Sequence, residues 1–347
     1  MVRLWASSKL QSGLLRGYWG GELLWGGPQA VHAKSNPGFR LALVVPTKDR
    51  PESLRRMLKS LAEQAPCPMK VAVVASGTKA SEAVAAEFPH LAIDYLHVDF
   101  ASIPGQRNVG IEAVKDDADL IGFVDDDVVF HPGSIQSMLA FWEQAPEDVG
   151  GAGFNFQNEL APETARKWAL APVKALYRLF LGKQTAKGKM LPSGFPTPIY
   201  PVDETIQVEW LETLAVVFRK VVLERFRGDE AYGGYDCVGF VDFTYTIGRQ
   251  HRLYVVKDAC VTHYCSPITN SYLLGKKQIL NRIYFVQKHP ELSLARCLGA
   301  LVLHTGFNVA VGLMLRDVGY FKRALGNVVG LTQAASGRLG PAAGGIK

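Results

Sequence analysis

Three consecutive aspartates, Asp125 to Asp127, follow directly on the apolar run 120–124. The apolar run suits a buried strand, whereas adjacent carboxylates repel one another and are costly to bury without partners. Oxygen-rich acidic turns bind hard divalent ions such as Mg²⁺ or Mn²⁺, which hold substrate phosphates through one or two carboxylates. Two interpretations follow: a metal site at the end of a strand, or a surface turn whose acids cap the next segment.

The elements around the aspartates alternate between strand and helix patterns. β-branched apolar runs predict strands at residues 39–46, 69–75, 91–98 and 120–124. Helical spacing of apolar residues predicts helices at residues 53–64, 81–88 and 106–114, with Ser53 as a cap. This alternation implies an α/β fold with a doubly wound, mostly parallel sheet, which binds ligands beyond the carboxyl ends of its strands. The turn after Pro46 and the aspartates both lie at that edge.

The second half departs from this regular alternation. Strand patterns recur at residues 149–154, 207–219, 253–256 and 259–264, and helix patterns at 220–226, 240–249, 272–289 and 298–315. We interpret 156–206 as an insertion, either an acceptor loop or a membrane-surface helix, because 167–183 is basic and amphipathic. A helix packed on the domain is the alternative. Residues 269–347 form a helical extension, in which polar side chains favour a core or interfacial helix at 298–315 over a membrane span.

Composition narrows the partners and the compartment. The chain has 347 residues, 48% of them hydrophobic, which excludes wholesale disorder. Lys and Arg number 38 against 32 Asp and Glu, a balance that favours phosphates or an anionic lipid surface. No dense basic block interleaved with aromatics occurs, so nucleic acid is not an expected partner.

Five cysteines without a Cys-x-x-Cys pair predict reduced thiols in the cytoplasm. Residues 1–38 read as an irregular leader rather than a signal peptide.

Five segments in order resemble family 2 glycosyltransferases of the GT-A fold, of the type that builds bacterial polysaccharides and cell-surface glycans. They are residues 45–51, 105–110, 125–127, 208–211 and His263. The resemblance places a GT-A domain at residues 39–268. It implies an inverting enzyme that uses Mg²⁺ or Mn²⁺ to move a sugar from a nucleotide-diphosphate-sugar donor to a saccharide or lipid-linked acceptor. It also implies a cytoplasmic protein, with peripheral contact to the inner face of the plasma membrane as the alternative to a freely soluble one.

The same resemblance assigns roles to individual residues. The donor-binding residues are Pro46, Thr47, Asp49, Arg50, Arg107, Asp125 and Asp126. The metal ligands are Asp125, Asp127 and His263. Trp210 and Glu212 take the acceptor side, where an aromatic face suits stacking on a sugar ring. Core packing of Trp210 and a structural ion pair for Arg107 are the alternatives.

The chain departs from the family pattern at two places. Ala75-Ser76-Gly77 stands where family members commonly carry an Asp pair, and Gly239-Phe240 stands where they carry Glu-Asp. The catalytic carboxylate is therefore expected at Asp236, with Asp242 as second choice and a helix-start role as the alternative for Asp242. These departures keep two other hypotheses open: a catalytically silent GT-A-like module that binds a glycan or partner, and a nucleotidyltransferase.

Overall fold

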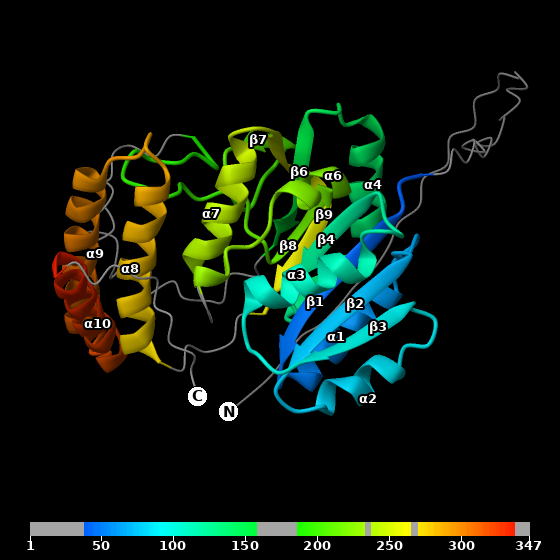
Figure 1. The fold of residues 1–347 in the computed structure, drawn as a ribbon, viewed down its shortest axis with the longest axis horizontal. Coiled ribbons are helices and arrows are strands. Elements are labelled where there is room, and N and C mark those ends of the chain that lie inside the picture. Colours follow the sequence, from blue (N-terminus) through cyan, green and yellow to red (C-terminus); the bar gives the residue numbers. More distant parts are fainter. Residues whose placement is uncertain (1–37, 158–185, 233–236, 265–269, 337–347) are drawn as a thin grey trace, which may run out of the picture. The chain divides into compact units, whose positions relative to one another are not determined.

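A mixed sheet of nine strands organises the chain in the computed structural model, which describes residues 38–157, 186–232, 237–264 and 270–336 (Figure 1). All of these residues belong to one compact unit. The predicted helix at 167–183 and the predicted base Asp236 lie outside the described residues. The strand order is β3 (Ile93–Val98), β2 (Lys70–Ser76), β1 (Leu41–Lys48), β4 (Leu120–Val124), β8 (Ala215–Arg219), β6 (Val149–Phe156), β9 (Arg252–His263) and β5 (Val128–Phe130), with β7 (Ile206–Val208) paired to β9.

The first half of the fold is a run of βα units. Its elements are β1 (Leu41–Lys48), α1 (Pro51–Ala62), β2 (Lys70–Ser76), α2 (Ala80–Ala86), β3 (Ile93–Val98), α3 (Ile103–Val114) and β4 (Leu120–Val124). The strands pair in parallel, β1 between β2 and β4, and β2 with β3. Their carboxyl ends therefore share one edge of the sheet, as the alternation predicted.

The second half adds antiparallel strands. Its elements are β5 (Val128–Phe130), α4 (Ser134–Gln144), β6 (Val149–Phe156), β7 (Ile206–Val208), β8 (Ala215–Arg219), α6 (Lys220–Arg225), the short helix η1 (Glu230–Tyr232), α7 (Cys237–Gly248) and β9 (Arg252–His263). β8 runs antiparallel to both β4 and β6, whereas β6 and β9 are parallel. β5 and β7 are both antiparallel to β9.

Helices cover both faces of the sheet. On one face, Leu58 of α1 and Trp142 of α4 pack with the strand residues that include Leu43 and Val73. On the other face, Ile111 of α3 joins the core with Val44 and Phe123. The helix α3 approaches β1 closely at Gly110, where an added Cβ would lie 2.2 Å from Cγ1 of Val44. This close approach packs the second half of α3 tightly against β1.

Three helices follow the sheet at the C-terminal side: α8 (Ser271–Lys288), α9 (Leu294–Leu315) and α10 (Val318–Ala335). α8 packs on α7, and α10 packs along α8 (Figure 1). α8 begins with an N-cap, because the Asn270 side chain accepts a hydrogen bond from the Leu273 amide. The predicted helical extension is thus a layer of three helices in the described part of the chain.

Three local expectations were wrong in detail. The run 207–219 is two strands, β7 and β8, separated by an irregular segment, and β9 continues through the break expected near residue 257. Helix α1 starts at Pro51 rather than after Ser53, because proline suits the first turn of a helix. The expected α/β architecture is confirmed.

Candidate active site

The three aspartates lie in the turn between β4 and β5. β4 is fully buried and ends at Val124, and the Asp125 amide donates to the Leu214 carbonyl at 2.8 Å. β5 then pairs antiparallel with β9, in a register that sets Val128 opposite His263. Strand pairing therefore brings His263 next to Asp127, 136 positions earlier in the chain.

Each aspartate has a basic partner. Arg107 of α3 lies 2.7 Å from Oδ1 of Asp125. Arg50 bridges the other two, with its nitrogens 2.7 Å from Asp126 and 2.7 Å from Asp127. Thr47 also donates its hydroxyl to Asp126 at 2.7 Å. The repulsion expected from three adjacent carboxylates is thus offset by two guanidinium groups and a hydroxyl.

The environments push the three pKa values apart. Burial raises the pKa of Asp125 against the opposing charge of Arg107. Burial also raises the pKa of Asp126 to about 7, although Thr47 and Arg50 act in the other direction. Burial disfavours the charged form of Asp127 as well, but the charges of His263 and Arg50 outweigh it and lower the pKa of that carboxyl. Of the three aspartates, Asp127 is therefore the one whose surroundings most favour the ionised form.

Arg107 is positioned by Thr213, which lies in the segment just before β8. Its guanidinium donates to the Thr213 hydroxyl at 2.6 Å and to the Thr213 carbonyl at 2.8 Å, and its Cζ lies 5.2 Å from the centre of the Phe123 ring. Thr213 is fully buried. Sequence reasoning did not find this pairing, since 106 positions separate Arg107 from Thr213.

Asp127 and His263 fit an open cation site. Nε2 of His263 lies 3.1 Å from Oδ1 of Asp127, an oxygen that is buried and not oriented for a hydrogen bond. Within the described ranges, no group of three or more His, Cys, Asp or Glu residues converges on a closed metal site. Hard cations such as Mg²⁺ commonly use one or two protein ligands and complete their shell with substrate phosphates and water. The donor set therefore fits such an ion only together with a substrate.

Two adjoining cavities meet at Asp125. The larger has a volume of about 460 Å³ and extends past Trp210, Glu212, Asp229 and Phe240. The smaller, about 120 Å³, is lined at the end of β1 by Pro46, Thr47 and Arg50, together with Asp126. Asp125 and Ile103 line both. A ligand that spans the two cavities would pass the aspartates.

Residues 42–196, which carry β1 to β6 and the three aspartates, match the family model described as "Glycosyl transferase family 2". This domain belongs to glycosyltransferase family 2. The family expected from the sequence is thereby confirmed, and with it the prediction of an enzyme that transfers a glycosyl group. His263, Trp210 and Glu212 lie beyond the matched residues.

Solved glycosyltransferase structures share the fold. A structure of residues 1–349 of TarS from S. aureus is 14% identical, with a TM-score of 0.50 over 86% of this chain and 91% of that one. The mannosyltransferase PcManGT from Pyrobaculum calidifontis, solved with GDP-Man and Mn²⁺, is 12% identical, with a TM-score of 0.50 over 86% of this chain and 87% of that one. GalNAc-T7, solved with UDP, GalNAc and Mn²⁺, is 10% identical, with a TM-score of 0.54 over 73% of this chain and 48% of that one. Among curated protein sequences there is no match.

Trp210 and Glu212, the two residues predicted to bind the acceptor, both line the larger cavity. Trp210 is only 5% exposed, yet its buried indole Nε1 has no hydrogen-bond partner among the described residues. Trp210 also belongs to the apolar core, as the core-packing alternative expected, and its acceptor-side role stays a prediction. Burial raises the pKa of Glu212, and His263 opposes this shift only in part.

On the donor side, Asp49 lies apart from the other predicted residues. Its carboxylate accepts hydrogen bonds from the Thr78 amide at 2.7 Å and the Thr78 hydroxyl at 2.8 Å, and it does not line the smaller cavity. Asp49 thus braces the turn at Gly77, where the family's Asp pair is replaced. An Asp with positive φ, here 52°, is tolerated because its short side chain bonds locally.

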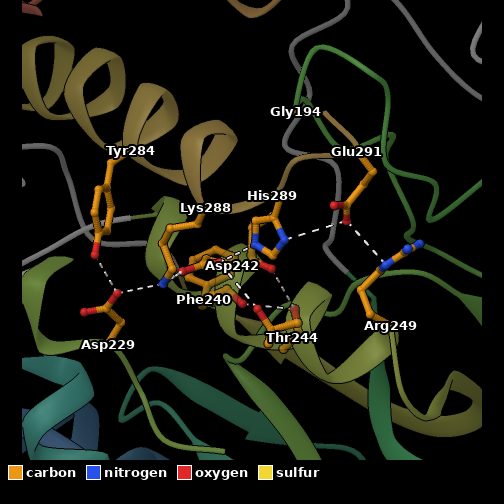
Figure 2. Close-up of polar contacts among 12 residues, drawn as sticks. Gly194, Asp229, Phe240, Asp242, Thr244, Arg249, Tyr284, Lys288, His289 and Glu291 are labelled. Atoms are coloured by element: carbon orange, nitrogen blue, oxygen red, sulfur yellow. Dashed lines mark hydrogen bonds and ion pairs between the residues drawn. The ribbon is translucent and has the colours of Figure 1, made fainter. Parts of the chain in front are cut away.

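Asp242, the second-choice base, does not line the larger cavity. It is 2% exposed on α7, and its carboxylate is paired with Lys288 and, at 2.7 Å, with Nε2 of His289 (Figure 2). Lys288 also contacts Asp229 at 2.7 Å, and Tyr284 donates to Asp229 at 3.1 Å. Asp229 lines the cavity and was not singled out from the sequence.

Proposed function

We propose that the protein is an inverting, metal-dependent glycosyltransferase that uses a nucleotide-diphosphate-sugar donor. The observation that carries the proposal is the position of Asp125 at the border of two cavities, beside Asp127 and His263. The smaller cavity suits the nucleotide, the larger suits the sugar and the acceptor, and the diphosphate would lie at the aspartates. The structures of PcManGT and GalNAc-T7 were solved with Mn²⁺ and nucleotide ligands, which is consistent with this assignment.

Asp127 and His263, the latter as a neutral imidazole, would hold Mg²⁺ or Mn²⁺, with Asp125 as a third ligand if Arg107 releases it. Such an ion supplies Lewis-acid stabilisation of the charge that develops on a leaving diphosphate. Two arginine side chains add to this stabilisation of the leaving group. Arg107 and Arg50 are held beside the aspartates, at 9% and 33% side-chain exposure, and their fixed charges need no reorganisation during the reaction.

Transfer requires a proton acceptor for the attacking hydroxyl. The acceptor oxygen forms a bond to the anomeric carbon from the face opposite the diphosphate, the carbon–oxygen bond to the diphosphate breaks, and the hydroxyl proton passes to a carboxylate. Among the described carboxylates that line the larger cavity, Glu212 has a raised pKa and lacks the lysine that Asp229 contacts. A carboxylate of raised pKa is the stronger base. We assign this role to Glu212, with the sequence-predicted Asp236 as its competitor.

We assign the acceptor to saccharides or lipid-linked saccharides, in surface-glycan synthesis at the cytoplasmic face of the membrane. Trp210 supports a sugar acceptor, because it offers an aromatic face and an indole N–H without a partner among the described residues. The basic balance of the chain supports a site near anionic lipid.

Product analysis tests the proposal. The purified protein is incubated with a panel of UDP- and GDP-sugars, with Mn²⁺ or with EDTA. Release of nucleoside diphosphate that needs Mn²⁺ supports glycosyl transfer, whereas pyrophosphate release would indicate a nucleotidyltransferase and no release a silent module. Asp127→Asn should abolish the release, and Asp119→Asn, an exposed aspartate paired with Arg40, is the matched control.

A further inference from the structure

The outer helices α9 and α10 carry an unusual share of exposed apolar side chains. Ten of the large hydrophobic residues that are exposed within the described ranges lie on these two helices or at their ends. Val302 is 59% exposed and Leu313 66% on α9, and Val318 is 62% exposed and Leu325 58% on α10. Monomeric soluble proteins rarely expose contiguous apolar patches of this kind without using them.

The exposed residues follow helical spacing. On α9, Val302, Val309 and Leu313 recur at intervals of seven and four, which places them on one side of the helix. Leu301 and Asn308 are each 1% exposed and lie on the other side, toward the protein. α9 is also long and apolar enough to cross a membrane, but 28% of its apolar window is buried against the protein. One side of α9 is therefore committed to packing and the other is bare.

Close packing fixes the orientation of α10. An added Cβ at Gly326 would lie 2.1 Å from the Tyr272 carbonyl, and one at Gly275 would lie 2.2 Å from the Arg323 carbonyl. The backbones of α8 and α10 therefore touch through glycines, and this contact cannot be rotated without clashes. The opposite side of α10, with Phe321, Leu325 and Val328, is held outward.

Most charged residues near the exposed side chains are basic. α9 carries Arg296 in its first turn and no other charged residue, and Arg316 follows it. α10 carries Lys322 and Arg323 and no acid, and Asp317 at its start caps the Gly319 amide at 2.8 Å. Exposed apolar residues flanked by basic ones are typical of helices that lie at an anionic lipid surface.

We propose that α9 and α10 dock side by side onto an anionic phospholipid bilayer, with their exposed apolar residues in the boundary between headgroups and acyl chains. A second copy of the chain fits less well, because a two-fold contact would bring like basic residues together. α8 links this surface to the site, since it packs along α10 and contributes Arg282 to the larger cavity. The proposal rests on the proposed function only in its purpose: membrane docking would give the active site access to a lipid-linked acceptor.

Vesicle flotation tests the docking surface. The full chain is mixed with vesicles of phosphatidylcholine and phosphatidylglycerol at about 7:3, or of phosphatidylcholine alone, without donor or metal. We expect flotation with the anionic vesicles that weakens with salt, and about fivefold weaker partitioning in Lys322→Gln. The double variant Leu313→Glu, Leu325→Glu should lose flotation at least tenfold, while Val221→Glu on α6, at 57% exposure, should retain it. Unchanged thermal unfolding of the variants checks their fold.

Three results would overturn the proposal. The double variant floats as well as the wild type; the wild type does not float but forms a dimer that the same substitutions dissociate; or alkaline carbonate fails to release the bound protein, which would indicate a membrane span. Donor hydrolysis measured without vesicles tests the proposed function separately. A variant that only loses membrane docking should still hydrolyse the donor at the wild-type rate.

Discussion

Replacing Asp242 by asparagine should cost stability rather than chemistry. The Asp242 carboxylate is 2% exposed and is paired with Lys288 and His289, and Lys288 in turn contacts Asp229 at the cavity (Figure 2). Asp242→Asn removes the negative charge that these two groups share while keeping the shape of the side chain. The buried ion pair then loses its carboxylate, while Lys288 keeps its positive charge.

The magnitude follows from burial. Removing one partner of a buried ion pair costs about 3–5 kcal/mol, because the other charge is left uncompensated. The low end applies here, since the Lys288 side chain is 34% exposed and keeps Asp229 as a partner. We expect a loss of about 3 kcal/mol in the free energy of unfolding. For a domain of this size, that corresponds to a fall in Tm of about 5 °C.

Thermal unfolding and initial rates at a temperature where both proteins are folded provide the assay. Because Asp242 does not line the cavity, kcat for donor turnover should stay within about threefold of wild type. Asp119→Asn is the matched control: its pair with Arg40 is 42% and 51% exposed, so we expect less than about 1 kcal/mol. An unchanged Tm together with a thousandfold loss of kcat would refute the reasoning and make Asp242 the proton acceptor.

Two further predictions concern the cavity. Glu212→Gln should lower kcat by about 10²–10⁴-fold, as loss of a general base does. The Glu212 carboxylate must be ionised to accept a proton, and burial raises its pKa, so wild-type kcat/KM should rise with pH through a value above the usual 4.5. Glu212→Gln should remove this rise with pH. If Asp236→Asn lowers kcat by this amount and Glu212→Gln does not, the proton acceptor is Asp236. Trp210→Ala should raise the acceptor KM about tenfold or more with the donor KM unchanged, and an equal rise in both would contradict an acceptor-side role.

The sequence predicted those parts of the fold that local patterns determine. The βα units up to β4 carry clear strand and helix periods, so their elements and the aspartate turn were found within a few residues. His263 was assigned by the family resemblance, at the end of a predicted strand, and the pairing of β5 with β9 brings it to Asp127. These features depend on strand edges, which short-range patterns reveal.

Partners from distant elements could not be read in the same way. Arg107 depends on Thr213, and Asp242 on His289, over 106 and 47 positions. Nothing in the local pattern of α7 indicates that α8 will neutralise its carboxylate. The irregular segment between β7 and β8 was also missed, because Trp210 and Leu211 continue an apolar run that resembles a strand. That segment carries Trp210 and Glu212 to the cavity.

In the proposed enzyme, the aspartates bind a nucleoside diphosphate through a divalent ion. The most direct measurement is the Tm of the wild-type chain with UDP or GDP, in Mn²⁺ and in EDTA. At about 100 times Kd, a ligand that binds only the folded state adds about 2.7 kcal/mol, which here corresponds to a rise of about 5 °C. We predict this rise with one of the two nucleotides in Mn²⁺ and its loss in EDTA and in Asp127→Asn. An equal rise in EDTA, or no rise with either nucleotide, would contradict the claim.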